Sequence, residues 1–199
     1  MKLLIATHNQ HKVTEIRQIF QSPRLELISA AEVPGLPQDI DEDADTFEGN
    51  ALKKARTLCQ ASGLWTLADD SGLEVAALDN APGVHSARYA GPECVSAENN
   101  RKLLRELDGV SDRSARFRCA IALCAPDGRE WTVDGSCAGS IIAAPRGAAG
   151  FGYDPLFVPD GYDKTFAELG PETKNRISHR ANALKRAEAE WSELLGLEK

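Results

Sequence analysis

The apolar residues of the first seventy positions predict a strand, two helices and a second strand, in that order. The run LLIA at residues 3–6 is typical of a buried strand, and from Val13 onward apolar residues recur at helical spacing. Thr46 is a candidate N-cap and opens a second amphipathic helix whose apolar face starts at Phe47. The run WTLA at residues 65–68 predicts another strand, which we expect to end at residues 69–72.

The second half of the chain changes to alternation with a period of two. Ser96 is a candidate cap for a helix that Gly109 would end, and apolar residues then alternate from Phe117 to Leu123. A turn at residues 126–128 separates them from a second alternating run, which predicts an antiparallel hairpin. We expect the last helix to begin near Ser178. The mixed pattern favours an α/β fold with a partly antiparallel sheet.

Composition and charge narrow the class of protein. The chain has 199 residues, 42% of them apolar, so we expect one domain over residues 1–199 with no separable linker. A net charge of −7 opposes binding to a nucleic acid polymer, so any substrate from nucleic acid chemistry would be small. No apolar run approaches the roughly 20 residues of a membrane span, and we expect no membrane partner.

The five cysteines point to a reducing compartment. Their number is odd, they show no CxxC spacing, and most lie in apolar runs. These features favour reduced, buried thiols over a disulfide framework or a zinc site, and we expect a cytoplasmic protein.

The polar loop at residues 7–12 is the first candidate site. It joins a buried strand to a helix N-terminus, where unpaired N–H groups and the helix dipole favour anions, and Lys12 adds a full positive charge. A solvated connector fits the same residues at least as well, because the loop has neither a GxxxxGK[ST] nor a GxGxxG motif.

An acidic stretch at residues 39–48 leads into the second helix. Acids before a helix are favoured by its dipole, so capping and solubility explain them without any function. Asn50 and Lys54, one turn apart beside the apolar face, are harder to explain in that way. We consider both to be candidate substrate-binding residues, since Lys54 could reach a phosphate.

Asp69 and Asp70 form the strongest local signal. Adjacent carboxylates at the end of an apolar strand are typical of a functional edge, whereas a turn needs only one Asp and the following glycine. Mg²⁺ prefers oxygen ligands and can be held by one or two carboxylates together with substrate phosphates. A plain turn is the alternative.

Lys174 and the segment SHR at residues 178–180 form the last cluster. If Ser178 is an N-cap, His179 and Arg180 lie in the first helical turn, where cations oppose the dipole, so an anion should compensate them. If the helix instead starts near Pro171, both residues lie in mid-helix on a solvated face.

Taken together, these clusters resemble the inosine triphosphate pyrophosphatase (Ham1-like) family, the pyrophosphatases of non-canonical purine nucleoside triphosphates. The motifs cover nearly the whole chain in the family's order, and each alone would be weak. The matching residues are ATHNQHK at 6–12, TFEGNA at 46–51 with Lys54, ADDSGL at 68–73, PG at 82–83, SARY at 86–89, GFGYDP at 150–155, and Lys174 with ISHR at 177–180.

The resemblance implies a two-lobed α/β protein with a long, mixed, twisted sheet flanked by helices and a nucleotide cleft between the lobes. It implies a homodimer and Mg²⁺-dependent hydrolysis of ITP, dITP or XTP between the α and β phosphates, which gives a monophosphate and pyrophosphate. Such an enzyme removes these nucleotides from the nucleotide pool.

The resemblance also implies roles for individual residues. Asp70 would accept the proton of the attacking water, with Asp69 as the second carboxylate, although the residues alone do not decide which of the two is the base. Glu42 and Asp70 would hold the metal, with Asp41 or Asp43 as possible substitutes for Glu42. The substrate-binding residues would be Thr7, His8, Asn9, Gln10, His11, Lys12, Lys54 and Lys174 for the triphosphate, Ser71 for the substrate, and His179 and Arg180 for the base.

The segment FGYD at residues 151–154 suits a purine. Phe151 can stack on the ring, Gly152 allows close backbone approach, and Tyr153 and Asp154 can line the edge. Donors from His179, Arg180 and backbone amides would favour O6 over the N6 amine of adenine, because two facing donors stay unpaired. We therefore expect rejection of ATP more clearly than of GTP.

Two other functions remain open. Maf-like pyrophosphatases share the broad fold and act on other nucleotides, but FGYD and SHR favour purines. A nucleotide sensor without turnover is the alternative from another class, and the Asp69–Asp70 pair argues against it. Two departures from the family pattern, His8 and the GAAG run at residues 147–150, bear on affinity and leave every group of the mechanism in place.

Overall fold

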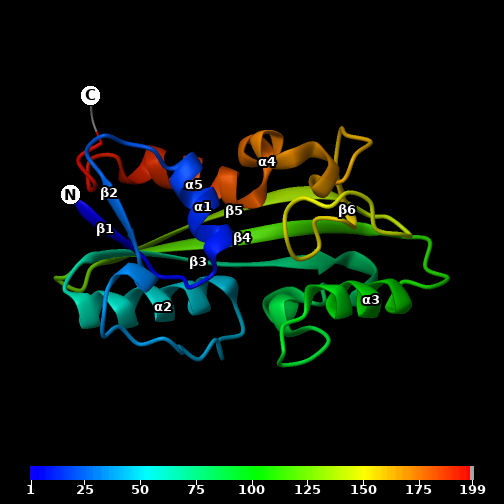
Figure 1. Cartoon of the computed structure of the whole chain (residues 1–199), viewed down its shortest axis with the longest axis horizontal. Helices are drawn as coiled ribbons and strands as arrows, with labels where there is room; N and C mark the ends of the chain where they lie inside the picture. Colours follow the sequence, from blue (N-terminus) through cyan, green and yellow to red (C-terminus); the bar gives the residue numbers. More distant parts are fainter. Residues whose placement is uncertain (198–199) are drawn as a thin grey trace. The chain divides into compact units, whose positions relative to one another are not determined.

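The computed structural model describes residues 1–197 as an α/β protein with one six-stranded sheet (Figure 1). The strand order is β2-β1-β3-β4-β5-β6. The strands are β1 (Lys2–Ile5), β2 (Glu26–Ser29), β3 (Trp65–Val75), β4 (Ser114–Cys124), β5 (Glu130–Ile141) and β6 (Phe157–Pro159). The α-helices are α1 (Gln10–Ile19), α2 (Phe47–Ser62), α3 (Ser96–Glu106), α4 (Phe166–Ile177) and α5 (His179–Trp191), with short 3₁₀ helices at Ala30–Glu32, Ala76–Leu78 and Gly83–Arg88.

The sheet is mixed, as the sequence predicts. β1 pairs in parallel with β2 and with β3, so that Leu3 lies opposite both Leu27 and Trp65. β5 and β6 pair antiparallel, and β4 and β5 are hydrogen-bonded neighbours joined by a tight turn at residues 125–129. The predicted α/β class with a partly antiparallel sheet is confirmed.

The chain divides into two compact units. Unit 1 comprises residues 1–70, 119–135 and the segment from Arg180 onward, and unit 2 comprises residues 71–118 and 136–179. β3, β4 and β5 each contribute residues to both units. The expectation of a single domain with two lobes stays a prediction.

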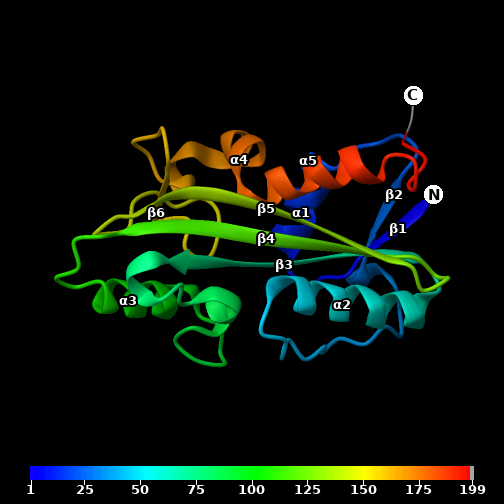
Figure 2. The same ribbon diagram turned by 180° about the vertical axis from the view of Figure 1, so that it is seen from behind.

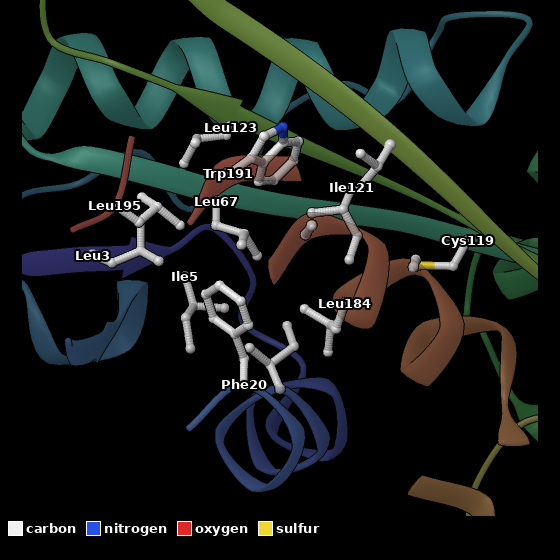
Figure 3. Packing of buried hydrophobic residues seen from close by; sticks show 14 of the residues in the cluster. Leu3, Ile5, Phe20, Leu67, Cys119, Ile121, Leu123, Leu184, Trp191 and Leu195 are labelled. Atoms are coloured by element: carbon white, nitrogen blue, oxygen red, sulfur yellow. The ribbon is translucent and has the colours of Figure 1, made fainter. Parts of the chain in front are cut away.

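The core of unit 1 lies between the sheet and two helices. Leu3, Ile5 and Leu67 point to the same side as Cys119, Ile121 and Leu123 of β4, because alternate residues of a strand share a face. Leu184 and Trp191 from α5 and Phe20 from the end of α1 fill this layer (Figure 3). The other face of β3 is covered by α2, whose Phe47, Ala51, Ala55 and Leu58 are buried (Figures 1 and 2).

Unit 2 has an aromatic core of its own. Phe117 packs against Phe157 and Phe166, with ring centroids 4.8 Å and 6.0 Å away, and Leu103 and Leu107 from α3 and its end join the same cluster. Leu73 and Val75, from the part of β3 that belongs to unit 2, complete this cluster.

Several predicted element ends are confirmed by the backbone. Thr46 is the N-cap of α2, and its hydroxyl accepts a hydrogen bond from the Gly49 N–H at 3.0 Å. The last helix begins at His179, as predicted, but a separate helix, α4, ends directly before it. Ser96 is the first residue of α3 and Val95 its N-cap, so the predicted cap is wrong by one position.

Three further predictions need correction or comment. β3 does not end at Asp69 but continues to Val75. Cys59, Cys119 and Cys124 are buried as expected, whereas Cys94 is exposed and Cys137 is half-buried, so the expectation of buried thiols is wrong for Cys94. Over residues 1–197, none of the helices combines the length and the apolar character that crossing a bilayer requires.

Candidate active site

Asp69 and Asp70 lie inside β3, so they face opposite sides of the sheet. The sequence predicts that the strand ends at this pair, which is typical of a functional edge, with a plain turn as the alternative. The structure overturns that prediction: the strand runs on for five residues beyond Asp70, and the alternation of a strand directs the two side chains apart. Asp69 points with Leu67 toward α1 and α5, and Asp70 points toward α2.

Asp69 is held between two cations. Its Oδ2 atom lies 3.1 Å from the Nζ atom of Lys12 on α1, and it accepts hydrogen bonds from Nη2 and Nε of Arg180 at 2.8 Å and 3.2 Å. Arg180 is fully buried, and its Nη1 atom also contacts Glu15 on α1. Lys12, Glu15, Asp69 and Arg180 therefore form one buried network, two carboxylates balanced by two cations.

This environment keeps Asp69 ionised. Burial by itself would raise the pKa of its carboxyl group, but the nearby charges of Lys12 and Arg180 outweigh burial and hold the pKa well below its usual range. A carboxylate with so low a pKa is a weak base. Its contacts suit it to holding Lys12 and Arg180 in place.

The network also explains the cation Arg180 at the start of α5. His179 and Arg180 occupy the first helical turn, where the dipole disfavours positive charge, and the sequence predicts an anion to compensate them. For Arg180 the compensating groups belong to the protein itself, because Asp69 and Glu15 both bind its guanidinium. Sequence reasoning missed Glu15, although its spacing of three residues from Lys12 places both on one face of α1.

On the other face, Asp70 contacts two residues of α2. Its Oδ2 atom accepts a hydrogen bond from Nδ2 of Asn50 at 3.2 Å, and its Oδ1 atom lies 3.3 Å from Nζ of Lys54. The same ammonium group donates to Oε1 of Glu42 at 2.6 Å. The three residues Glu42, Lys54 and Asp70 thus form a cluster of two carboxylates around one lysine.

The acidic segment reaches this cluster by running back along α2. Glu42, Asp43 and Ala44 contact Lys54, Lys53 and Asn50 in turn, so Glu42 and Ala44 meet helix residues one turn apart. Gly49 permits a close approach of the loop, since a Cβ atom there would lie 2.8 Å from the Cβ atom of Ala44. Of the three acids named as possible metal ligands, only Glu42 turns to the buried lysine, and Asp43 pairs with Lys53 at 2.7 Å on the exposed side.

The pKa of Asp70 moves in the opposite direction from that of Asp69. Burial raises it, Lys54 and Lys12 partly offset this, and the neighbouring charges of Glu42 and Asp69 raise it further, so the net shift is upward. Lys54 is buried too, which disfavours its charge, but Asp70 and Glu42 more than compensate and raise its pKa. Asp70 is therefore an ionisable group whose proton affinity is increased.

The Glu42–Lys54–Asp70 cluster fits a divalent cation. Two carboxylates supply the hard oxygen ligands that Mg²⁺ prefers, and a single lysine leaves the cluster with one negative charge in excess. Within residues 1–197 there is no group of three or more His, Cys, Asp or Glu side chains arranged to hold a metal. A metal held here would be bound by Glu42, Asp70 and oxygen atoms of a bound phosphate compound.

The loop at residues 7–12 leaves most of its side chains in solvent. Residues 8–11 are exposed, while Thr7 and Lys12 are half-buried. Asn9 is the N-cap of α1: its Oδ1 atom accepts from the N–H groups of His11 and Lys12 at 3.0 Å and 3.3 Å. The first turn of α1 contains no acidic residue, so the positive end of its dipole and Lys12 act together.

Unit 2 holds the remaining predicted residues. Lys174 and Asp154 form a buried ion pair at 2.6 Å, and the same Oδ2 atom of Asp154 accepts from the Phe151 N–H at 2.8 Å. The Lys174 ammonium lies 4.5 Å from the centroid of the Phe151 ring. Gly150 is required here, because a side chain would meet the Asp154 carboxylate at 2.1 Å.

The other two aromatic candidates are part of the unit 2 core. The Tyr153 hydroxyl donates to the carbonyl of Ser86 at 2.9 Å, and the residue is only 4% exposed. His179 is also buried and stacks on Phe117, with ring centroids 4.7 Å apart. Ser71 and Gly152 are half-buried. The structure therefore brings Phe151, Asp154 and Lys174 together and places Tyr153 and His179 in the aromatic core.

The chain is similar to known proteins over almost its whole length. Residues 3–190 match the model of the Ham1 family. A "dITP/XTP pyrophosphatase" of Desulforamulus reducens is 50% identical over 189 residues, 94% of each chain, and one of Geobacter sulfurreducens is 49% identical over 185 residues, 92% of each chain.

Solved structures show the same likeness. The Ham1 protein of Staphylococcus aureus superposes with a TM-score of 0.87 at 39% identity, covering 98% of this chain and 100% of the other. A HAM1 protein of Coxiella burnetii gives a TM-score of 0.88 at 41% identity, covering 97% and 99%. The predicted resemblance is confirmed: this chain belongs to the Ham1 family.

Proposed function

We propose that this protein is a nucleoside triphosphate pyrophosphatase that hydrolyses the non-canonical purine nucleotides ITP, dITP and XTP to a monophosphate and pyrophosphate. The observation that carries the proposal is the separation of the two aspartates on β3. Asp70 combines a raised pKa with a neighbouring carboxylate and lysine, while Asp69 stays ionised and is paired with two cations. The names of the relatives, dITP/XTP pyrophosphatases, point to the same activity.

The triphosphate would bind at the positive end of α1. The exposed loop at residues 7–12 offers backbone and side-chain donors, and Lys12 and Lys54 supply two positive charges in unit 1. Phosphoryl transfer needs mainly positioning and neutralisation of charge, which these groups provide. Asp69 contributes by holding Lys12 in place.

We propose Asp70 as the proton acceptor. Attack of water on phosphorus forms a P–O bond, breaks the bond between the α and β phosphates, and releases a proton that the Asp70 carboxylate takes up. A raised pKa makes this carboxylate a better base than an exposed one. Glu42 and Asp70 would hold Mg²⁺, which when bound neutralises charge on the phosphate oxygens.

The base would bind in unit 2. The half-buried Phe151 ring can stack on a purine, and Lys174 beside it is a donor that suits the O6 atom of hypoxanthine or xanthine. This assigns Lys174 to the base instead of the triphosphate role that the resemblance implies. Arg180 would act through Asp69, because its guanidinium is fully buried against that carboxylate and Glu15.

Product analysis tests the proposal. Purified protein is incubated with Mg²⁺ and, separately, ITP, XTP, GTP and ATP, and the nucleotides, pyrophosphate and orthophosphate are quantified. We expect monophosphate and pyrophosphate from ITP and XTP, little from ATP, and loss of both products when Mg²⁺ is chelated. Diphosphate with orthophosphate, or tight binding without turnover, would contradict the proposal. The implied homodimer stays a prediction that light scattering can check.

A further inference from the structure

We infer that Asn50 is a positioning residue, one that holds Asp70 and the Glu42 loop in register without touching the substrate. The sequence marks Asn50 as a candidate substrate-binding residue, but its side chain is 0% exposed. The inference rests on the proposed function, because its effect on turnover passes through Asp70.

Both ends of the Asn50 amide are engaged inside unit 1. Oδ1 accepts a hydrogen bond from the Ala44 N–H at 3.0 Å, and Nδ2 donates to Oδ2 of Asp70 at 3.2 Å. The Asn50 N–H donates to the Thr46 carbonyl at 3.1 Å, which fixes the residue in the first turn of α2. These two hydrogen bonds link a loop and a strand that are distant in sequence. Because the amide is planar and its backbone is fixed, the two bonded groups are held in one relative orientation.

The link matters because Glu42 and Asp70 come from different elements. Glu42 lies two residues before Ala44 on the acidic loop, and Asp70 lies in β3. Two ion pairs also tether this loop: Lys53–Asp43 is exposed and of little strength, and Lys54–Glu42 uses the two groups that would turn to phosphate and metal. Asn50 is the neutral link that can persist when those charged groups change partners.

Asn50 also orients the Asp70 carboxylate. Its donation to Oδ2 leaves Oδ1 directed to Lys54, on the side where Glu42 lies. Partners of this kind, which hold a ligand or base in one orientation, typically change metal affinity or activity by about 10–100-fold when removed.

The test compares Asn50→Ala and Asn50→Asp with a matched control, Lys53→Ala. All three alter a residue of α2 that tethers the acidic loop, but the Lys53 ammonium pairs with Asp43 on the exposed side. For each variant kcat and KM for ITP and the Mg²⁺ concentration for half-maximal activity are measured, with circular dichroism and thermal melting as folding checks.

We expect Asn50→Ala to lower kcat and raise the Mg²⁺ requirement by about 10–100-fold, with KM for ITP nearly unchanged, and Lys53→Ala to change neither noticeably. Asn50→Asp keeps the acceptor for the Ala44 N–H but sets a carboxylate against Asp70. It should therefore lose at least as much kcat as Asn50→Ala. If Asn50→Asp were the milder change, the residue would only fasten the loop, and the inference would be wrong.

A double-mutant cycle with Asp70→Asn separates this inference from the proposed function. In the Asp70→Asn background, Asn50→Ala should cause little further loss of kcat, because the group that it positions is already disabled. A full additional loss would overturn the inference. Near-normal turnover of Asp70→Asn alone would overturn Asp70 as the base, and the Mg²⁺ requirement of the Asn50 variants would still decide whether Asn50 positions the metal ligands. An Asn50→Ala protein that fails to fold leaves the decision to Asn50→Asp, which retains the loop contact.

Discussion

The two faces of β3 carry neighbouring aspartates in contrasting surroundings. On one face Asp69 is enclosed with Glu15 by Lys12 and Arg180, so the charges balance and the pKa falls. On the other face Asp70 shares one lysine with Glu42, and burial raises its pKa, an effect that Lys54 and Lys12 only partly offset and to which the charge of Glu42 adds. The division of roles in this pair follows from which face each side chain occupies, and mutual repulsion contributes only a minor part.

The contrast also separates stability from activity. A buried ion pair that loses one partner leaves an uncompensated charge, so the Asp69 network should matter first for folding. The Asp70 cluster has an excess negative charge, which lowers stability but can bind a cation. This cluster should therefore matter first for turnover.

The largest effect is expected from Asp70→Asn. Loss of a general base typically costs about 10²–10⁴ in kcat, and the isosteric amide should leave KM for ITP and the fold largely intact. Steady-state kinetics of the purified variant checks this. A variant with kcat close to that of the wild type would remove Asp70 from the chemical step.

Arg180→Met should act mainly on stability. It leaves Asp69 and Glu15 buried with less positive charge, which costs about 3–5 kcal/mol, or roughly 2–4 °C in Tm for each kcal/mol in a chain of this size. The control is Arg186→Met, since Arg186 is half-exposed and its pairs with Asp134 and Glu190 are at the surface. Equal melting temperatures for the two variants would contradict a special role for the buried network.

Gly49→Ala probes the approach of the acidic loop to α2. The added methyl group would meet Ala44 at 2.8 Å, and overpacking of this kind costs about 1–3 kcal/mol. The loop should shift away from α2, so the Mg²⁺ requirement should rise while the response to Mg²⁺ of a Lys53→Ala variant stays near that of the wild type. Mg²⁺ titrations of ITP hydrolysis measure both. An unchanged Mg²⁺ requirement would show that Glu42 does not depend on this packing.

The smallest effect concerns the stability of Asp70→Asn as pH changes. Because the folded protein raises the pKa of Asp70, it favours the protonated group, and the ionised form costs stability above that pKa. Asparagine removes this cost, so the variant should melt a few degrees higher than the wild type at neutral pH. The difference should shrink as pH falls through the raised pKa. Thermal melts between neutral and acidic pH check the sign, and a lower Tm at neutral pH would reverse the comparison.

Local features were predictable because short-range interactions decide them. The cap at Thr46 needs only the hydroxyl and the Gly49 N–H three residues on, and the buried faces of α1 and α2 follow from the spacing of their apolar residues. The hairpin of β4 and β5 is likewise set by alternation and a tight turn. The motifs that carry the family resemblance are linear as well, and the family is confirmed.

The amino-acid sequence alone therefore determined the α/β class, the family, and the set of charged residues from which a site is built. Only the tertiary structure decided how those charges are paired. β3 continues through two aspartates because partners from α1, α2 and α5, distant in sequence, bind them on both faces. The contacts of Asn50 with Asp70 and of Arg180 with Glu15 also join elements that are distant in sequence. Electrostatic partners depend on distances of a few ångströms between separate elements, and no local pattern along the chain encodes those distances.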